Sequence, residues 1–231
     1  MGTGSRGARG HGWLNKYRSG LGGRHLQGRY HARDTRALVE LNNQVFALNA
    51  KSGESKSSNS SNGAYLDLMV DGESEPRRIT IELASAALPE TCENFLSLCE
   101  SGYELSKMFK IEKNVGLCFG DKRGSNGEEG RCSDGLSKGD EAHKSQVFEH
   151  EPLVLSHAEK GMVSMLSPGL DKNDSRFIIT TVEDAPQLDG SFVAFGRVKE
   201  GMKELEHIAS SIFTKKGRPT VDVKVVSCGV L

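Results

Sequence analysis

The chain has 231 residues, of which 36% are hydrophobic and 26% are charged, and its formal net charge is −1. No apolar run approaches the ~20 residues of a membrane helix, and no signal-peptide core follows Met1, so we expect an intracellular protein without a membrane span. The five cysteines lack CxxC spacing, which favours a reducing compartment, either cytoplasmic or organellar, the mitochondrion included.

Residues 1–34 form a basic extension rich in glycine and arginine. Residues 1–33 contain nine glycines, which disfavour a regular helix, and seven Lys or Arg residues without any acid. Subtracting these seven charges leaves −1 − 7 = −8 for residues 34–231. An extended N-terminal tail therefore precedes an acidic body.

Three interpretations of this tail remain open: a solvated tail, an organelle-targeting peptide, or an anchor. As an anchor, it would contact phosphates or an acidic protein surface with its cations and stack its aromatic rings on bases. The expected binding residues are Arg6, Arg9, Trp13, Lys16, Tyr17, Arg18, Arg24, Arg29 and Arg33. This hypothesis predicts a large protein or ribonucleoprotein assembly as the partner of residues 1–49, and nothing indicates a homo-oligomer.

Residues 35–49 are predicted to form a short amphipathic helix. Leu38, Leu41, Val45 and Leu48 recur at helical spacing. The helix could pack on its own domain or on a partner. Residues 50–63 follow as a serine-rich linker.

Residues 64–231 alternate between short strand patterns and turn signals. Strands are expected at 65–70 and 79–83 around the Asp71–Gly72 turn, and again at 177–182 and 192–198 around a two-residue turn at Asp189–Gly190. Helices are expected over 88–99, with Pro89 in the first turn, and over 202–212. With a closing strand at 221–225, this pattern favours a barrel or a sandwich.

His143, His150 and His157 are spaced by seven residues, with Cys132 upstream. This spacing matches no compact zinc pattern, so neither a metal nor another cofactor is expected.

Residues 64–231 resemble the cyclophilin-type peptidyl-prolyl cis-trans isomerases. The matching features are Leu88-Pro89-x-Thr91-x-x-Asn94-Phe95, Gly161, Ser164-Met165, Asn173, Ser175, Phe177, Leu188-Asp189-Gly190 and Val193-x-Phe195-Gly196-x-Val198. The resemblance implies a mainly β fold: a closed eight-stranded antiparallel β-barrel capped by two α-helices, with a substrate groove on its outer face.

The resemblance also implies how such a groove works. Rotation about an X–Pro bond has a barrier of about 18–20 kcal/mol, and the catalyst must favour the twisted amide. In the family, an arginine donates hydrogen bonds that favour a pyramidal prolyl nitrogen, an apolar pocket holds the proline ring, and a glutamine and an asparagine hold the backbone. No nucleophile, metal or cofactor is needed.

At these groove positions the chain departs from the family pattern. Lys110 stands for the arginine, Cys118 for the glutamine, and Val115 and Gly116 for a pocket phenylalanine and methionine. Further departures are Leu166 and Ser167 for alanine and asparagine, Arg176 for a glutamine, Ile178 for a pocket phenylalanine, Gln187 for a tryptophan and Phe192 for a histidine, while Leu188 is kept.

We therefore expect a cyclophilin-like domain without efficient isomerase activity, which serves as a scaffold or accessory subunit. The alternative is a weak or active isomerase in which Lys110 replaces the arginine. Lys110 is also open to interpretation as an ordinary surface lysine, because lysine is rarely buried without a partner. A third alternative is a peptide-binding module without catalysis, and the altered pocket predicts weak or no cyclosporin binding. Cys118 is expected to be an inert thiol.

Overall fold

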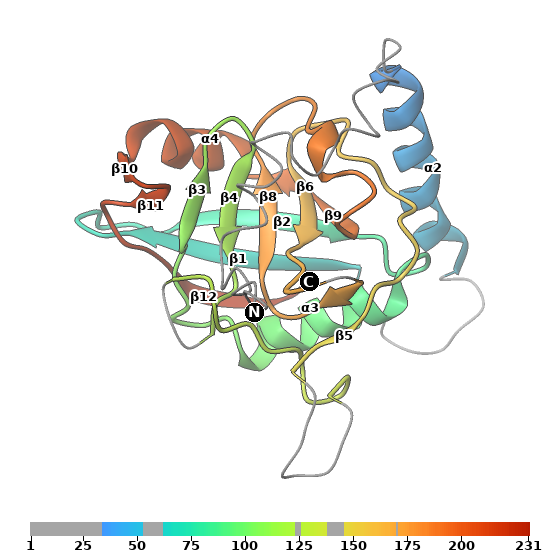
Figure 1. Cartoon of the computed structure of the whole chain (residues 1–231), viewed down its shortest axis with the longest axis horizontal. Coiled ribbons are helices and arrows are strands. Elements are labelled where there is room, and N and C mark those ends of the chain that lie inside the picture. The colour runs from blue at the N-terminus through green and yellow to red at the C-terminus, as the bar shows by residue number, and fades with distance from the viewer. Residues whose placement is uncertain (1–33, 53–61, 123–125, 138–145, 170) are drawn as a thin grey trace, which may run out of the picture. The chain divides into compact units, whose positions relative to one another are not determined.

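Eight antiparallel strands form one curled sheet in the order β12-β1-β2-β9-β6-β8-β4-β3 (Figure 1). The computed structural model describes residues 34–52, 62–122, 126–137, 146–169 and 171–231. The basic extension up to Arg33 and residues 53–61 of the expected linker lie outside this range. Within the described residues, no helix is long and apolar enough to cross a membrane.

The strands of this sheet are short, and some bury every side chain while others bury mainly alternate positions. In β1, for example, Leu66, Leu68 and Val70 are buried two residues apart, as the strand repeat requires. The strands are β1 (Gly63–Val70), β2 (Arg77–Leu83), β3 (Lys110–Glu112), β4 (Gly116–Phe119), β6 (Met162–Met165), β8 (Phe177–Thr180), β9 (Ala194–Glu200) and β12 (Val223–Val230).

Residues 105–108, which lead into β3, connect the two edges of the sheet. The backbone N–H groups of Leu105 and Met108 donate to the carbonyl oxygens of Val225 and Val223 on β12, each over 2.8 Å. The predicted mainly β, eight-stranded antiparallel fold is confirmed.

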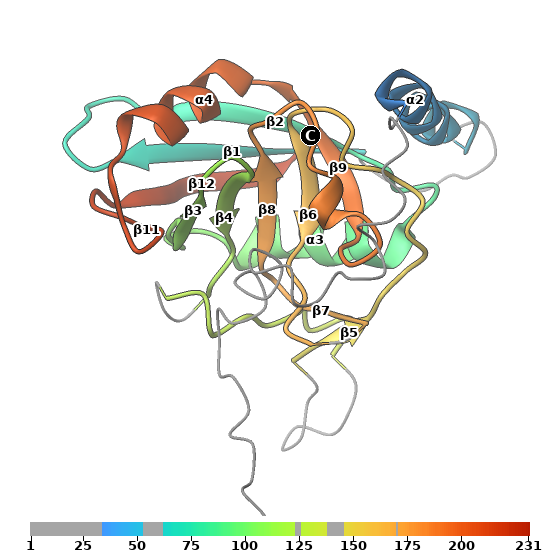
Figure 2. The ribbon, with the colours of Figure 1, turned by 45° about the horizontal axis from the view of Figure 1, so that its top comes forward.

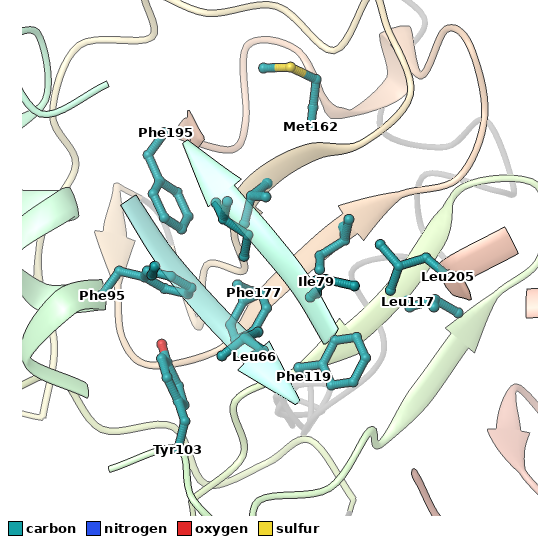
Figure 3. Packing of buried hydrophobic residues seen from close by; sticks show 14 of the residues in the cluster. Leu66, Ile79, Phe95, Tyr103, Leu117, Phe119, Met162, Phe177, Phe195 and Leu205 are labelled. Atoms are coloured by element: carbon teal, nitrogen blue, oxygen red, sulfur yellow. The ribbon is translucent and has the colours of Figure 1, made fainter. Parts of the chain in front are cut away.

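Two helices, α3 (Pro89–Ser101) and α4 (Met202–Ser211), cover opposite sides of the curled sheet (Figure 2). Helix α3 begins at Pro89, whose missing N–H is not needed in the first turn. An aromatic cluster fills the core with ring centroids 5.1 to 5.7 Å apart (Figure 3). Its members are Phe95, Tyr103, Phe119, Phe177 and Phe195.

Two small pairs of strands lie outside the main sheet. One consists of β5 (Phe148–Glu149) and β7 (Lys172–Asn173), and the other of β10 (Thr214–Lys215) and β11 (Arg218–Pro219).

The predicted turn at Asp189–Gly190 is present, but it does not join two paired strands. Strands β8 and β9 do not pair with each other, because β6 lies between them. The short helix η1 (Pro186–Leu188) also lies in this connection. Asp189 uses its carboxylate to accept the backbone N–H and ring Nδ1 of His157, at 2.8 and 2.7 Å.

Helix α2 (Thr35–Ser52) packs on its own domain through a face that includes two asparagines. The amide of Asn42 exchanges hydrogen bonds with the backbone N–H and C=O of Ser156, both at 3.0 Å. Asn49 donates to the Leu83 carbonyl at 2.6 Å and accepts from the Ala86 N–H at 3.0 Å. Phe46 between them is buried in the core.

The predicted apolar stripe therefore coincides only in part with the buried face of α2, since Val45 packs against the core. Leu41 and Leu48 are 52% and 42% exposed, whereas Asn42 and Phe46 are buried. The guanidinium carbon of Arg197 lies 4.2 Å from the Phe46 ring centroid and adds a cation–π contact.

Candidate functional site

Four strands align one row of side chains across the sheet. Lys110 pairs with Cys118, Cys118 with Ile178, and Ile178 with Ser164. The neighbouring row of Ile111, Leu117, Ile179 and Val163 belongs to the core. Because successive side chains of a strand point to opposite faces, the first row faces outward from the core.

Lys110 is not a surface lysine. Its side chain is 11% exposed, and its ammonium lies 2.6 Å from a carboxylate oxygen of Glu112. Glu112 is two residues further along β3, so both side chains emerge on the same face. The interpretation of Lys110 as an ordinary surface residue is wrong because Glu112 supplies the partner that burial requires.

Cys118 beside it is fully buried. Burial raises the pKa of the thiol to about 12, and the nearby Lys110 ammonium lowers it only in part. The sulfur is therefore a neutral thiol at physiological pH, with neither the charge nor the nucleophilicity of a thiolate.

Arg176 is engaged with the protein itself. Its guanidinium donates to the carboxylate of Asp174 at 2.5 and 3.0 Å and to the Gly127 carbonyl at 2.5 Å. Asp174 is buried, and this desolvation raises its carboxyl pKa although Arg176 lowers it. Arg176 thus fastens the loop around Gly127 to the segment that enters β8.

Val115, just before β4, and Gly116, the first residue of β4, differ in the space available for a side chain. Val115 is buried. At Gly116, a Cβ atom would lie 2.1 Å from the backbone oxygen of Ile179 on β8. The neighbouring strand therefore leaves no room for a side chain at Gly116.

The remaining candidates lie on the connections around β6, η1 and β9. Leu166 donates its N–H to the Arg176 carbonyl at 2.7 Å, and Phe192 donates to Leu188 at 3.2 Å, so each pair is adjacent. Leu166, Ile178, Leu188 and Phe192 are buried, whereas Ser167 and Gln187 are partly exposed. The buried members offer little surface to a ligand.

The histidines serve separate structural contacts. His150 bonds through Nε2 to the Lys172 carbonyl at 3.1 Å, while His157 bonds to Asp189. His143 and all nine candidate residues of the tail lie outside the described residues.

Sequence reasoning missed Glu112 and Asp174, the partners of Lys110 and Arg176. The signal for both was the spacing of two residues, which places opposite charges on one face of an extended segment.

Comparison with known proteins agrees with this fold. The family model for cyclophilin type peptidyl-prolyl cis-trans isomerase/CLD matches residues 65–230. NK-tumor recognition protein of Homo sapiens is 36% identical over 166 residues, which cover 67% of this chain but only 11% of that protein.

In two further relatives, the match covers a larger share of the relative's own chain. Peptidyl-prolyl cis-trans isomerase D of Kluyveromyces lactis is 32% identical over 72% of this chain and 45% of its own length. Peptidyl-prolyl cis-trans isomerase B of Saccharomyces cerevisiae is 32% identical over 68% of this chain and 75% of its own length. The chain belongs to the cyclophilin-type peptidyl-prolyl cis-trans isomerase family.

Proposed function

We propose that this domain lacks efficient prolyl isomerase activity and acts as a scaffold or accessory subunit in a larger assembly. The observation that carries the proposal is the buried ion pair between Lys110 and Glu112. Lysine presents a single ammonium and not a planar fork of donors, and here that ammonium is already bound to a carboxylate. Removing one preorganised donor from a comparable site costs about 2.7–4 kcal/mol of transition-state stabilisation.

The surrounding residues support the same conclusion. The Cys118 thiol is fully buried, and Arg176 is turned toward Asp174 and Gly127. Cys118 therefore cannot supply the backbone clamp that the family resemblance implies at its position, and Arg176 is already engaged with the protein itself.

A proline-peptide isomerisation assay on the full chain tests this proposal. We expect no acceleration above the uncatalysed rate. The same assay is run on the variant Lys110→Ala and on the control Lys113→Ala. The control changes an exposed lysine just beyond the same strand. Acceleration that disappears in Lys110→Ala and persists in Lys113→Ala would establish the alternative, an isomerase that uses Lys110 in place of arginine.

Binding without catalysis is tested separately, by titrating proline peptides or cyclosporin into the full chain. The burial of Ile178, Leu188 and Phe192 supports the expectation of weak or absent binding. Saturable binding without rate acceleration would identify a peptide-binding module.

The basic extension is proposed to anchor the domain in its assembly, through RNA or an acidic protein surface. Its seven cations beside a body of charge −8 support this role. Co-purification and RNA binding of the full chain, compared with a chain lacking residues 1–33 across a salt series, test it. The idea fails if neither measurement changes.

We also propose that the protein resides in a reducing intracellular compartment. All five cysteines are free, which supports this placement. Fractionation of cells, followed by immunodetection, tests it.

A further inference from the structure

A short hairpin, residues 213–219, carries three exposed cations and one exposed aromatic ring. We call it the basic hairpin. It contains β10 and β11, which pair Lys215 with Arg218 across the turn at Lys216 and Gly217. Figure 1 shows it beside β3, at the edge of the domain, just after the end of α4.

The backbone of the basic hairpin is held in place at three points. Lys216 and Gly217 have φ angles of 54° and 81°, as the two central residues of a type I′ turn require. Gly217 accepts the N–H of Ile111 at 2.9 Å, and the Phe213 carbonyl accepts both the N–H and the hydroxyl of Thr220 at 2.9 Å. The side chains therefore project from a preorganised backbone, which lowers the entropic cost of binding a partner.

The basic hairpin presents an unusual combination of side chains. Phe213 is 83% exposed, the largest exposure among the large apolar side chains described as exposed. Lys215, Lys216 and Arg218 are also exposed, and none forms an ion pair with another described residue. An isolated exposed phenylalanine needs no explanation, but one flanked by three unpaired cations on a rigid turn has the composition of an interface centre.

We propose that the basic hairpin is a docking site for an acidic peptide segment. Carboxylates of that segment pair with Lys215, Lys216 and Arg218, while an apolar side chain packs on the Phe213 ring. Arg218 also offers its planar fork for bidentate contact with a carboxylate.

Charge balance favours a short acidic peptide over a nucleic acid. Residues 34–231 carry a net charge of −8, so their net charge repels a long polyanion that extends beyond the basic hairpin. A peptide whose acidic residues span only a few positions confines its charge to the three cations.

The basic hairpin borders Lys110 of the candidate site but does not depend on that site. A Cβ atom at Gly217 would lie 3.2 Å from Cε of Lys110, so the turn packs against the lysine side chain. Docking on the basic hairpin requires no proline pocket and no catalysis, and it stands or falls independently of the proposed loss of isomerase activity.

The test measures binding of a fluorescein-labelled decapeptide that alternates carboxylate and aromatic side chains, by fluorescence anisotropy at physiological salt. The full chain is compared with the triple variant Lys215→Gln, Lys216→Asn, Arg218→Gln, in which asparagine tolerates the positive φ. The control Lys160→Gln, Lys199→Gln, Lys203→Gln removes the same charge from other exposed lysines and keeps the basic tail. We expect the affinity to fall about tenfold in the first variant and less than about twofold in the control.

A second variant, Phe213→Ser, keeps every charge and is expected to weaken peptide binding about threefold, with the loss persisting at high salt because it is apolar. Thermal melting confirms that each variant is folded. Equal losses in the two triple variants would overturn the proposal in favour of non-specific charge attraction. A single-stranded RNA whose affinity depends on the basic hairpin, while that of the peptide does not, would overturn it in favour of a nucleic-acid site.

Discussion

At Gly116, the close approach of the neighbouring strand decides which residue the candidate site can contain. A Cβ atom there would meet the Ile179 carbonyl at 2.1 Å. The methionine that the family resemblance places at this position therefore cannot be restored by a side-chain change alone, because β4 and β8 would have to separate.

The variant Gly116→Met is accordingly expected to destabilise the domain. Overpacking of a filled site costs about 1–3 kcal/mol, and contact with backbone puts this variant at the upper end. Urea unfolding measures the loss of free energy of unfolding. Gly135→Met is the matched control, because a Cβ atom at Gly135 meets nothing within 4 Å. Equal losses in the two variants would contradict the steric explanation.

The buried thiols make a second prediction at this scale, which concerns pH. Burial raises the pKa of both Cys92 and Cys118 to about 12, so their thiolate fraction at pH 8 is on the order of 10⁻⁴. We expect neither to react with iodoacetamide at pH 8 in the native state, and reaction to rise only as pH approaches 12. Mass spectrometry of the labelled peptides reports each site.

Half-buried Cys228, whose pKa is raised to about 11, serves as the internal comparison and should react before the other two. Unfolded protein should label at all five cysteines. Native Cys118 that reacts at the unfolded rate would show that the thiol is accessible and reactive.

Among the elements, α2 is the one whose docking depends on polar side chains. Asn42 is buried and satisfies both backbone groups of Ser156. Because its removal leaves these groups unpaired, we expect Asn42→Ala to lower the free energy of unfolding by about 1–3 kcal/mol. Gln44→Ala, an exposed position on the same helix, is the control and should change it by less than about 0.5 kcal/mol. Comparable urea midpoints for the two variants would show that the Asn42 bonds contribute no stability.

The same helix shows where prediction from sequence reaches its limit. Periodicity and Pro89 located α3, and residue alternation located five of the eight strands of the main sheet, because local pattern and tertiary burial agree there. The buried face of α2 could not be predicted, since Asn42 is buried and Asn49 partly buried only because backbone groups far along the chain meet them.

The candidate site was predictable to the same extent. Alignment with the family brought Lys110, Cys118 and Ile178 to one site, and strand register places them in one row. Glu112 matters as an ion-pair partner only because Lys110 is buried. Asp189–Gly190 has the residues of a hairpin turn, although β6 lies between the two strands on either side of it. Both facts are tertiary and leave no unambiguous local pattern.

At the scale of the whole molecule, the chain divides into one unit over residues 1–34 and another over Thr35–Leu231. The boundary lies before α2, not after it. Helix α2 therefore belongs structurally to the barrel, and only the basic residues that precede it remain for the proposed anchor.

Two truncations separate these contributions. A chain of residues 34–231 keeps α2 and should melt within about 2 °C of the full chain, because the second unit is intact. A chain of residues 53–231 loses Phe46 from the core and the bonds of Asn42 and Asn49. Loss of a buried phenylalanine lowers the free energy of unfolding by about 3–5 kcal/mol, and loss of each hydrogen-bonding side chain lowers it by about 1 kcal/mol. The melting temperature of this chain should therefore fall by roughly 10 °C or more. Circular dichroism during heating measures both. Equal melting temperatures for the two truncated chains would show that α2 adds no stability to the barrel and would leave its buried face free for a partner.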